Sequence, residues 1–403
     1  MSLKKLLAWL AALIGIAAVV FFGVLPPYVE AGMNRVTGPQ PPAASNRAAA
    51  LHKTLQIADM HADTLMWRRD LLARGSRGQV DVPRLTDGNV ALQILSSVTK
   101  TPKGQNYDAN GADTDNITLL TIAQGQPPRT WTSLVERSLW HAEKLYRFAA
   151  RSEGRLIPIR TRQSLELLIR KRRERVAGLP DGCIDNCIRT DAMGVLLSIE
   201  GLQNLEGKRV NLDRLYDAGF RMAGLVHFFD NELAGSMHGI KKGGLTPFGI
   251  EIVRAMEAKG MVVDIAHSSH VTVAQVLNMA TRPVVSSHGG VQATCKVNRN
   301  LTDDEIRGVA RTGGVVGIGY WDAAVCDTSP QGIVRAIAHV RNLVGIDHVG
   351  LGSDYDGAIE ARFDTSRLDA ITQALIDAGF SDVDIAKVMG GNVVRVLGAV
   401  LPN

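Results

Sequence analysis

Eight short apolar stretches, separated by segments of helical periodicity, constrain the fold of this chain more than any other feature. From about residue 55 onward they follow the pattern of repeated strand–helix units, which differs from that of a β-meander. The stretches are Leu55–Met60, Val90–Ser96, Gly194–Ile199, Met222–Val226, Gly260–Ala266, Pro283–Ser287, Gly314–Gly319 and His348–Gly352. Eight such units predict an α/β fold whose strands close a parallel (β/α)8 barrel of the TIM type.

One barrel domain accommodates nearly the whole chain. The 403 residues are 45% hydrophobic and 21% charged, which is enough to bury a large core, and the 40 glycines suit many tight turns. Between residues 100 and 191 the spacing of the apolar stretches widens, which indicates an excursion on the barrel and not a second domain. We therefore expect a barrel domain over residues 51–403 with an excursion over residues 100–191.

The first 25 residues predict a membrane anchor. Residues Leu6 to Leu25 carry no charge, are long enough to span a bilayer and follow Lys4 and Lys5, so the positive-inside rule places the bulk of the chain on the exported side. A cleaved signal peptide is the alternative, but a proline pair follows Leu25 where a small-residue cleavage site would stand. We expect a signal anchor over residues 1–25, a flexible tether over residues 26–50, and a catalytic domain in the periplasm.

Charge and cysteine content narrow the partners and the compartment. The formal net charge is +5, and the basic run over residues 170–175 indicates a solvated helix face, with contact to anionic lipid as the lesser alternative and no indication of nucleic acid. The four cysteines, Cys183, Cys187, Cys295 and Cys326, allow three full disulfide pairings in an exported protein. Zinc–thiolate ligation is less favoured, because the Cys183–Cys187 spacing has no matching second pair.

Polar residues directly follow most of the predicted strands. In a (β/α)8 barrel these positions lie together at the C-terminal mouth, where the chemistry is done. They are His61, Glu200, His227, His267, His288, Tyr320 and Asp354.

Five of the residues near this mouth predict a metal centre: His61, Asp63, Glu200, His267 and His288. His61 and Asp63, two apart on an extended backbone, can share one cation, although such a pair can also be structural. Glu200 ends a very apolar strand and needs a cation, or else a salt bridge. Two Zn²⁺ ions bridged by Glu200, one on His61 and Asp63 and the other on His267 and His288, would leave room for a water that becomes the nucleophile. Mn²⁺ and Co²⁺ are plausible substitutes.

Two further residues have the chemistry of catalytic groups. Asp354 can take the proton of the attacking water and pass it to the leaving amine, whereas its neighbour Asp356 is expected to cap the following turn. His227 can donate a hydrogen bond to the developing oxyanion; a third metal ligand and a core histidine are its alternatives. His238 is expected in a loop near the pocket and His270 on the surface.

As an ordered set, several motifs resemble the membrane dipeptidases (renal dipeptidase-like, peptidase family M19) of bacterial type. The resemblance covers roughly residues 55 to 400. It rests on His61-Ala62-Asp63, Ser198-Ile199-Glu200-Gly201, Gly244-Leu245-Thr246-Pro247-Phe248-Gly249, Asp264-Ile265-Ala266-His267, Ser287-His288, Asn298-Arg299-Asn300 and Gly352-Ser353-Asp354-Tyr355-Asp356-Gly357.

The resemblance implies a metal-dependent hydrolase with two Zn²⁺ ions on the five residues named above. It further implies that His227 contacts substrate, that Arg299 holds the substrate carboxylate, and that Asp354 is the acid/base. A guanidinium also makes independent sense as the bidentate partner of a dipeptide's carboxylate. The resemblance also implies a Cys295–Cys326 disulfide, and Cys183 and Cys187 would then pair locally.

The predicted activity is hydrolysis of dipeptides, including those with a C-terminal D-residue. The excursion over residues 100–191 can overhang the pocket and so affect which substrates are preferred. Hydrolysis of another amide or of a β-lactam-like ring on the same site is the alternative, and a non-catalytic barrel is a third. The sequence leaves a homodimer open.

Overall fold

Eight parallel strands form the predicted closed barrel in the computed structural model, which describes residues 2–178 and 189–403. The ring closes because β3 pairs with both β2 and β5, and β10 pairs with both β9 and β2. Every residue of these strands is buried, as expected when both faces of a parallel sheet are covered. The strands are β2 (Ile57–Ala62), β3 (Val90–Leu95), β5 (Met193–Ile199), β6 (Phe220–Gly224), β7 (Val262–Asp264), β8 (Val285–Ser286), β9 (Val315–Ile318) and β10 (Val349–Leu351).

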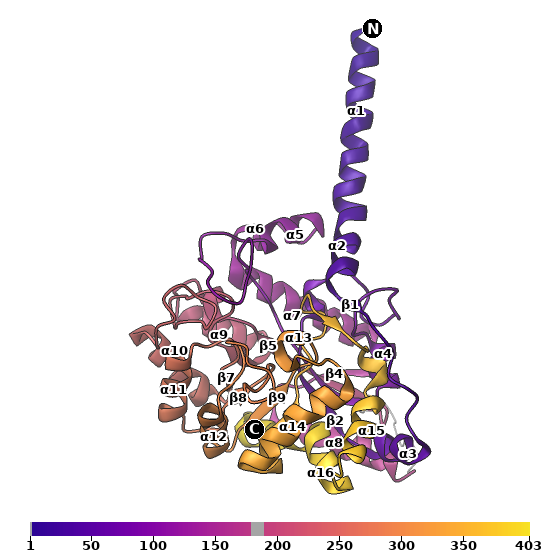
Figure 1. Cartoon of the computed structure of the whole chain (residues 1–403). Coiled ribbons are helices and arrows are strands. Elements are labelled where there is room, and N and C mark those ends of the chain that lie inside the picture. Colours follow the sequence, from indigo (N-terminus) through magenta and orange to yellow (C-terminus); the bar gives the residue numbers. More distant parts are fainter. Residues whose placement is uncertain (1, 179–188) are drawn as a thin grey trace.

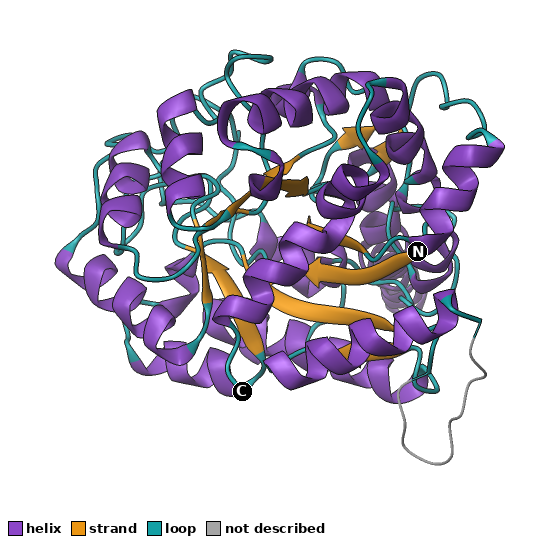
Figure 2. Cartoon of the chain, turned by 90° about the horizontal axis from the view of Figure 1, so that it is seen from below, coloured by secondary structure: helices purple, strands orange, loops and turns teal. Residues whose placement is uncertain are grey.

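Helices surround this barrel, and Figure 2 shows the strands ringed by them. Local signals set their ends: the side chains of Thr246 and Thr302 cap the first turns of α10 and α12, and Gly260 adopts a left-handed φ of 71° where α10 stops before β7. The helices that follow barrel strands are α4 (Val82–Asp87), α9 (Val210–Asp217), α10 (Pro247–Lys259), α11 (His270–Met279), α12 (Asp303–Arg311), α14 (Pro330–Val344), α15 (Asp369–Asp377), α16 (Asp382–Ala386) and α17 (Asn392–Val400).

Residues 100–191 leave the barrel between β3 and β5. Their described part holds a loop, then α5 (Ile117–Ala123), α6 (Arg129–Thr132), α7 (Leu134–Arg151), β4 (Leu156–Pro158) and α8 (Arg162–Val176). The strand β4 pairs with the first half of β5, and β6 pairs with the second half of β5. The basic run on α8 is not wholly a solvated face, because Arg172 is buried and donates hydrogen bonds to backbone oxygens of Asn89 and Ala192.

The N-terminus is a continuous apolar helix that projects from the barrel (Figure 1). It runs through α1 (Leu3–Val19), a π-helical turn (Val20–Val24) and α2 (Leu25–Met33), and is long and apolar enough to cross a membrane. Its most apolar window has no buried residue.

The flexible tether expected over residues 26–50 is wrong. Helix α2 packs on the barrel domain, β1 (Arg35–Val36) pairs with β11 (Glu360–Ala361), and α3 (Asn46–Thr54) contacts α15. The reason is Glu30, whose buried carboxylate forms ion pairs with Arg69 at 2.7 Å and Arg77 at 2.6 Å. A buried carboxylate requires such partners, so this segment has a fixed position.

A disulfide joins Cys295 and Cys326, with Cα atoms 5.4 Å apart, which confirms the predicted pair. It connects the loop after β8 to the end of α13 (Asp322–Val325), two segments beside the mouth of the barrel. The pair predicted for Cys183 and Cys187 lies outside the described residues.

Candidate metal centre

The ends of barrel strands bring the predicted ligands together. His61 lies on β2 with Asp63 just beyond it, and Glu200, His267 and His288 follow β5, β7 and β8. All five side chains are buried. Parallel strands in a closed barrel end at the same rim, which is why residues so far apart in sequence converge.

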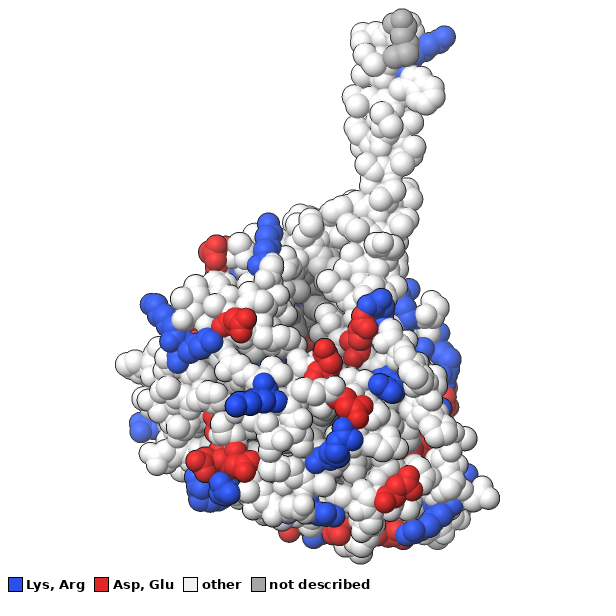
Figure 3. All heavy atoms as spheres, viewed as in Figure 1, with Lys and Arg blue, Asp and Glu red and all other residues white. Residues whose placement is uncertain are grey.

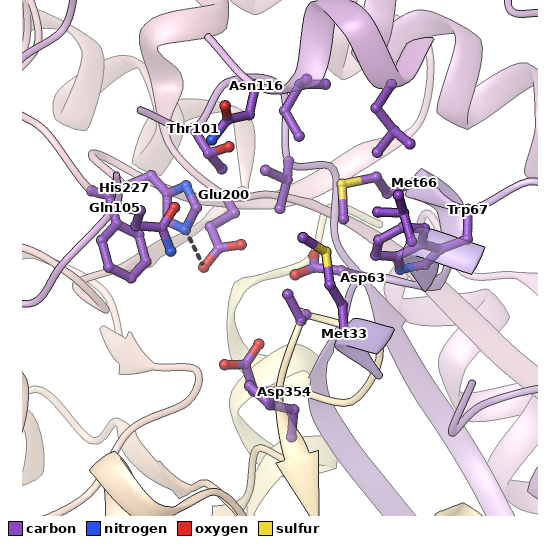
Figure 4. Close-up of a pocket in the computed structure, with 18 of the residues that line it drawn as sticks. Met33, Asp63, Met66, Trp67, Thr101, Gln105, Asn116, Glu200, His227 and Asp354 are labelled. Carbon is purple, nitrogen blue, oxygen red and sulfur yellow. Dashed lines mark ion pairs between the residues drawn. The ribbon is translucent and has the colours of Figure 1, made fainter. Parts of the chain in front are cut away.

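Glu200 is the centre of this cluster. Its Oε1 lies 2.8 Å from His267 Nε2, 3.2 Å from His288 Nε2 and 3.4 Å from His227 Nε2, and its Oε2 lies 3.5 Å from His61 Nε2. Figure 4 shows Glu200 between His227 on one side and Asp63 on the other. One carboxylate therefore faces four imidazoles.

Three sets of ligand atoms each lie within 4.8 Å of one another, and each is wholly buried. They are His61, Glu200 and His288; Glu200, His227 and His267; and His61, Asp63 and Asp354. The first two share Glu200, as a binuclear centre requires, and His227 joins the second set although the sequence assigned it chiefly to substrate.

The unpaired atoms of these residues fit metal ions. Among the described residues, His61 Nε2, Asp63 Oδ1 and Glu200 Oε2 are buried without a hydrogen-bond partner, an arrangement that is costly unless a cation completes it. Burial also lowers the pKa of His267 and of His288, which keeps both rings neutral, the form that binds metal. Burial has the same effect on His61, but the charges of Glu200 and Asp63 outweigh it and raise its pKa.

Two buried aspartates fix the backbone that carries the ligands. Asp59 Oδ1 accepts hydrogen bonds from the backbone N–H of His61 at 3.1 Å and of Ser353 at 3.0 Å, and so links β2 to the loop after β10. Asp264 Oδ1 does the same for Ala266 at 3.0 Å and Ser287 at 2.9 Å, and so links β7 to β8. The sequence assigned a role to neither aspartate, although a carboxylate inside an otherwise apolar strand was a usable signal.

Asp354 and Asp356 have different surroundings. Asp354 lies 3.9 Å from His61 Nε2, with its carboxyl at the cavity, and burial together with the charges of Glu200 and Asp63 raises its pKa well above the usual range. Asp356 is fully buried, and its carboxylate accepts hydrogen bonds from Thr64, Arg69 and the Gln79 backbone. Asp356 therefore supports the loop, whereas Asp354 lines the cavity.

The loop around Asp354 also has an unusual backbone. Asp354 and Asp356 have φ angles of 61° and 62°, and His267 has 64°, which side chains other than glycine seldom adopt. Such conformations persist only where surrounding contacts enforce them, and they concentrate at functional sites.

Arg299 is buried at the side of His267 and His288. Its Nη1 donates to the backbone oxygen of His288 at 3.0 Å, its Nη2 lies 3.3 Å from His267 Nε2, and its guanidinium lies 4.6 Å from the ring centroid of Trp321. The stacking on Trp321 and the hydrogen bond to the His288 backbone hold the Arg299 guanidinium beside the cluster. Arg299 also lines the cavity.

A cavity of about 490 Å³ opens above the cluster. Asp63, Glu200, His227, His267 and Asp354 face it. The excursion overhangs it, as the sequence suggested, and contributes Thr101, Gln105, Tyr107, Asn116 and residues of α5 to its lining. The sequence did not predict that α2 lines the cavity as well.

The two other histidines considered in the sequence, His238 and His270, lie at different distances from the cavity. His238 is buried in a loop, stacks on Phe228 at 4.6 Å and lies 5.3 Å from the His267 ring. His270 begins α11 and pairs with Glu305 at 2.6 Å on the surface. Both positions agree with expectation.

A closed parallel barrel with a buried cluster of imidazoles and carboxylates at its C-terminal mouth defines the class of barrel metallohydrolases. The family model of membrane dipeptidase (peptidase family M19) matches residues 45–401. The chain therefore belongs to that family.

Curated relatives agree over part of their length. The chain is 37% identical over 215 residues to dipeptidase aclJ of Aspergillus oryzae, which covers 51% of each chain. It is 30% identical over 229 residues to an uncharacterised protein encoded beside pqqA in Klebsiella pneumoniae, covering 53% of this chain and 84% of that one. The match thus spans about half the length of the first of these.

Solved structures agree over the fold. A metallopeptidase of family M19 described as dipeptidase AC superposes with a TM-score of 0.70, at 20% identity over 87% of this chain and all of that one. A metallopeptidase from Rhodobacter sphaeroides, liganded with a phosphinate mimic of the dipeptide L-Ala-D-Ala, superposes with a TM-score of 0.70. It is 19% identical, and the match covers 86% of this chain and 99% of that one.

Proposed function

We propose that this protein is a binuclear zinc dipeptidase, anchored in the membrane by its N-terminal helix, with its barrel on the exported side. The observation that carries the proposal is one buried carboxylate, Glu200, facing four imidazoles at 2.8 to 3.5 Å beside a buried arginine. The disulfide between Cys295 and Cys326 supports an oxidising compartment.

His61 and Asp63 would hold one ion, His267 and His288 the other, and Glu200 both. Imidazole with carboxylate ligation suits zinc. A bound pair of divalent ions supplies Lewis acidity and lowers the pKa of a water toward neutrality. The sharing of Glu200 by two ligand sets supports this arrangement.

The substrate is positioned by its carboxylate. Arg299 is the one buried arginine of the described chain that lines the cavity, and a guanidinium binds a carboxylate through two parallel hydrogen bonds. A dipeptide held there has its peptide carbonyl above Glu200. A longer peptide has no carboxylate at that distance, which selects dipeptides.

Two side chains then carry the proton transfer and the stabilisation of charge. Asp354 accepts a proton from the attacking water as the water oxygen bonds to the carbonyl carbon, and it delivers that proton to the amide nitrogen as the C–N bond breaks. His227 donates a hydrogen bond to the carbonyl oxygen as negative charge develops on it.

Dipeptides with a C-terminal D-residue are included in the proposed substrate class. The Rhodobacter sphaeroides structure with its L-Ala-D-Ala mimic supports this, since its barrel superposes on this one. In this chain Arg299 would bind the carboxylate and not the side chain of the terminal residue, so either configuration at that residue could be accepted.

The test uses the full-length protein in detergent, with its metal content measured by mass spectrometry. We expect hydrolysis of L-Ala–L-Ala and L-Ala–D-Ala, no hydrolysis of tri-alanine, and loss of activity on treatment with a chelator followed by recovery with zinc. Metal-loaded protein that cleaves no dipeptide would point instead to another amide or lactam. Protein that binds no metal would contradict the site itself.

A further inference from the structure

The cavity has two unlike sides. Its floor consists of the metal-binding and catalytic groups, whereas much of its wall is apolar and comes from segments outside the barrel. Figure 3 shows the surface hollowed beside the foot of the N-terminal helix. The helix α2 contributes Leu25, Pro26, Val29 and Met33 to this wall.

A second helix completes the wall. From α5 the lining residues are Ile117, Leu119, Leu120 and Ala123. Val29 and Leu120 pack against a small buried cluster of Met66, Trp67, Val98 and Ile117, and all four residues of this cluster also line the cavity. We call this surface, made by α2, α5 and that cluster, the apolar wall.

Helix α2 is fixed to the catalytic loops and is not only an anchor. Glu30 reaches Arg69, which in turn contacts Asp356 in the loop of Asp354. Asn34, directly after α2, accepts a hydrogen bond at 2.8 Å from the Ala358 backbone of the same loop. The wall therefore has a fixed position relative to the proposed acid/base.

The position of Arg299 decides which part of a substrate meets this wall. Arg299 lies beside His267, whose ring centroid is 4.7 Å from that of His227. Figure 4 shows Met33, Met66 and Trp67 gathered on the side of Asp63, opposite His227. A dipeptide with its carboxylate on Arg299 and its carbonyl above Glu200 thus extends its amino-terminal residue toward Met33 and Met66.

We propose that the apolar wall is the specificity pocket for the amino-terminal side chain, and that the preferred substrates are dipeptides whose first residue is large and apolar. This inference rests on the proposed function. The cavity, at about 490 Å³, is in the range that encloses ligands larger than two small residues. It follows that α2 must stay with the barrel after export, as part of the enzyme.

The first test is the intact mass of the protein extracted from membranes. We expect a chain that retains residues 25–33. A mature chain that begins after Met33 would overturn the proposal, because the part of the wall that α2 contributes would then be missing.

The second test compares kcat/KM for L-Leu–L-Ala with that for Gly–L-Ala, using the full-length protein in nanodiscs. Filling an apolar pocket with a leucyl side chain gives a preference of about tenfold to a hundredfold. We expect Val29→Asn or Met33→Gln to lower this ratio about tenfold. Tyr28→Ala is the matched control, because Tyr28 lies on the same helix, is 76% exposed and is not part of the wall, so the ratio should stay unchanged.

A third wall variant, at an exposed position, controls for misfolding. Leu119 is 58% exposed, so Leu119→Asn does not disturb a packed core, and we expect it to lower the ratio about threefold. A wild-type ratio near one, or ratios in the wall variants equal to that of the wild type, would overturn the proposed specificity while Gly–L-Ala is still cleaved. No cleavage of any dipeptide by metal-loaded wild-type protein would instead overturn the proposed function.

Discussion

The floor and the apolar wall of the cavity are built from different parts of the chain. The floor lies on strand ends, where each ligand lies at or just beyond the end of a buried strand and buried carboxylates fix the neighbouring backbone. The wall lies on α2 and α5, which precede the barrel or interrupt it. The proposed chemistry therefore belongs to the barrel, and the proposed selectivity belongs to its additions.

This difference determines which segments can change in sequence without displacing a metal ligand. Helices outside the barrel can change sequence without disturbing the strand register that places Glu200, whereas a shift at any strand end would displace a ligand. The floor should therefore control the rate of reaction and the wall should control the choice of substrate. Variants of floor and wall residues test this division.

The largest effect is expected for Asp354→Asn, on the floor. An amide cannot accept the proton of the attacking water, so kcat should fall by about 10²- to 10⁴-fold. Metal content, measured on the same preparation, should stay at the wild-type level, because all five proposed ligands remain. Asp356→Asn is unsuitable as a control because its carboxylate holds the loop; Asp327→Asn, on the surface with Arg335, is suitable. Wild-type turnover by Asp354→Asn would remove the acid/base role.

A smaller effect is expected for Arg299→Lys, between floor and wall. Lysine keeps the charge but lacks the planar fork, so KM for L-Ala–L-Ala should rise about tenfold to a hundredfold. The wild type should prefer this dipeptide to its C-terminal amide, and the variant should show a much smaller preference for the dipeptide. If the amide is the better substrate of both proteins, Arg299 does not bind a carboxylate, and another class of amide becomes the better assignment.

The floor could be predicted from sequence because its signals are local. Each predicted ligand follows one of the apolar stretches, so the strand and the functional residue are found together, and the eight stretches correspond to the eight strands of the barrel. The Cys295–Cys326 pair was predictable only from the family resemblance, since spacing alone left three pairings. Which ion each ligand serves depends on side-chain distances, and the sequence does not contain them.

The wall could not be predicted because its contacts are not local. Pro26 and Pro27 after an apolar helix, followed by a stretch rich in small residues, indicate a linker. The feature that contradicts this is one carboxylate, Glu30, whose partners Arg69 and Arg77 lie in the loop after β2. No periodicity connects these residues, so only the tertiary structure shows that α2 belongs to the site.

The smallest effect, and the most direct test of the link between wall and floor, is expected for Glu30→Gln. The variant keeps the shape of the side chain but removes the charge that Arg69 and Arg77 contact. Losing hydrogen bonds to charged groups weakens the docking of α2 by roughly 1.5–3 kcal/mol. The Thr37 N–H, which bonds to Ala361 O at 2.9 Å, should then exchange with solvent at least about tenfold faster, because its protection depends on this docking.

The same variant should lower the preference for L-Leu–L-Ala over Gly–L-Ala about threefold, since a loosened α2 still forms a wall for part of the time. Glu143→Gln is the matched control, because Glu143 forms an exposed pair with Arg129 and should change neither quantity. Faster exchange with an unchanged preference would separate docking from selectivity and leave α5 as the specificity element. Unchanged exchange would mean that the apolar contacts of Val29 hold α2 without the ion pairs, and Glu30 would then not be the residue that fixes the wall to the floor.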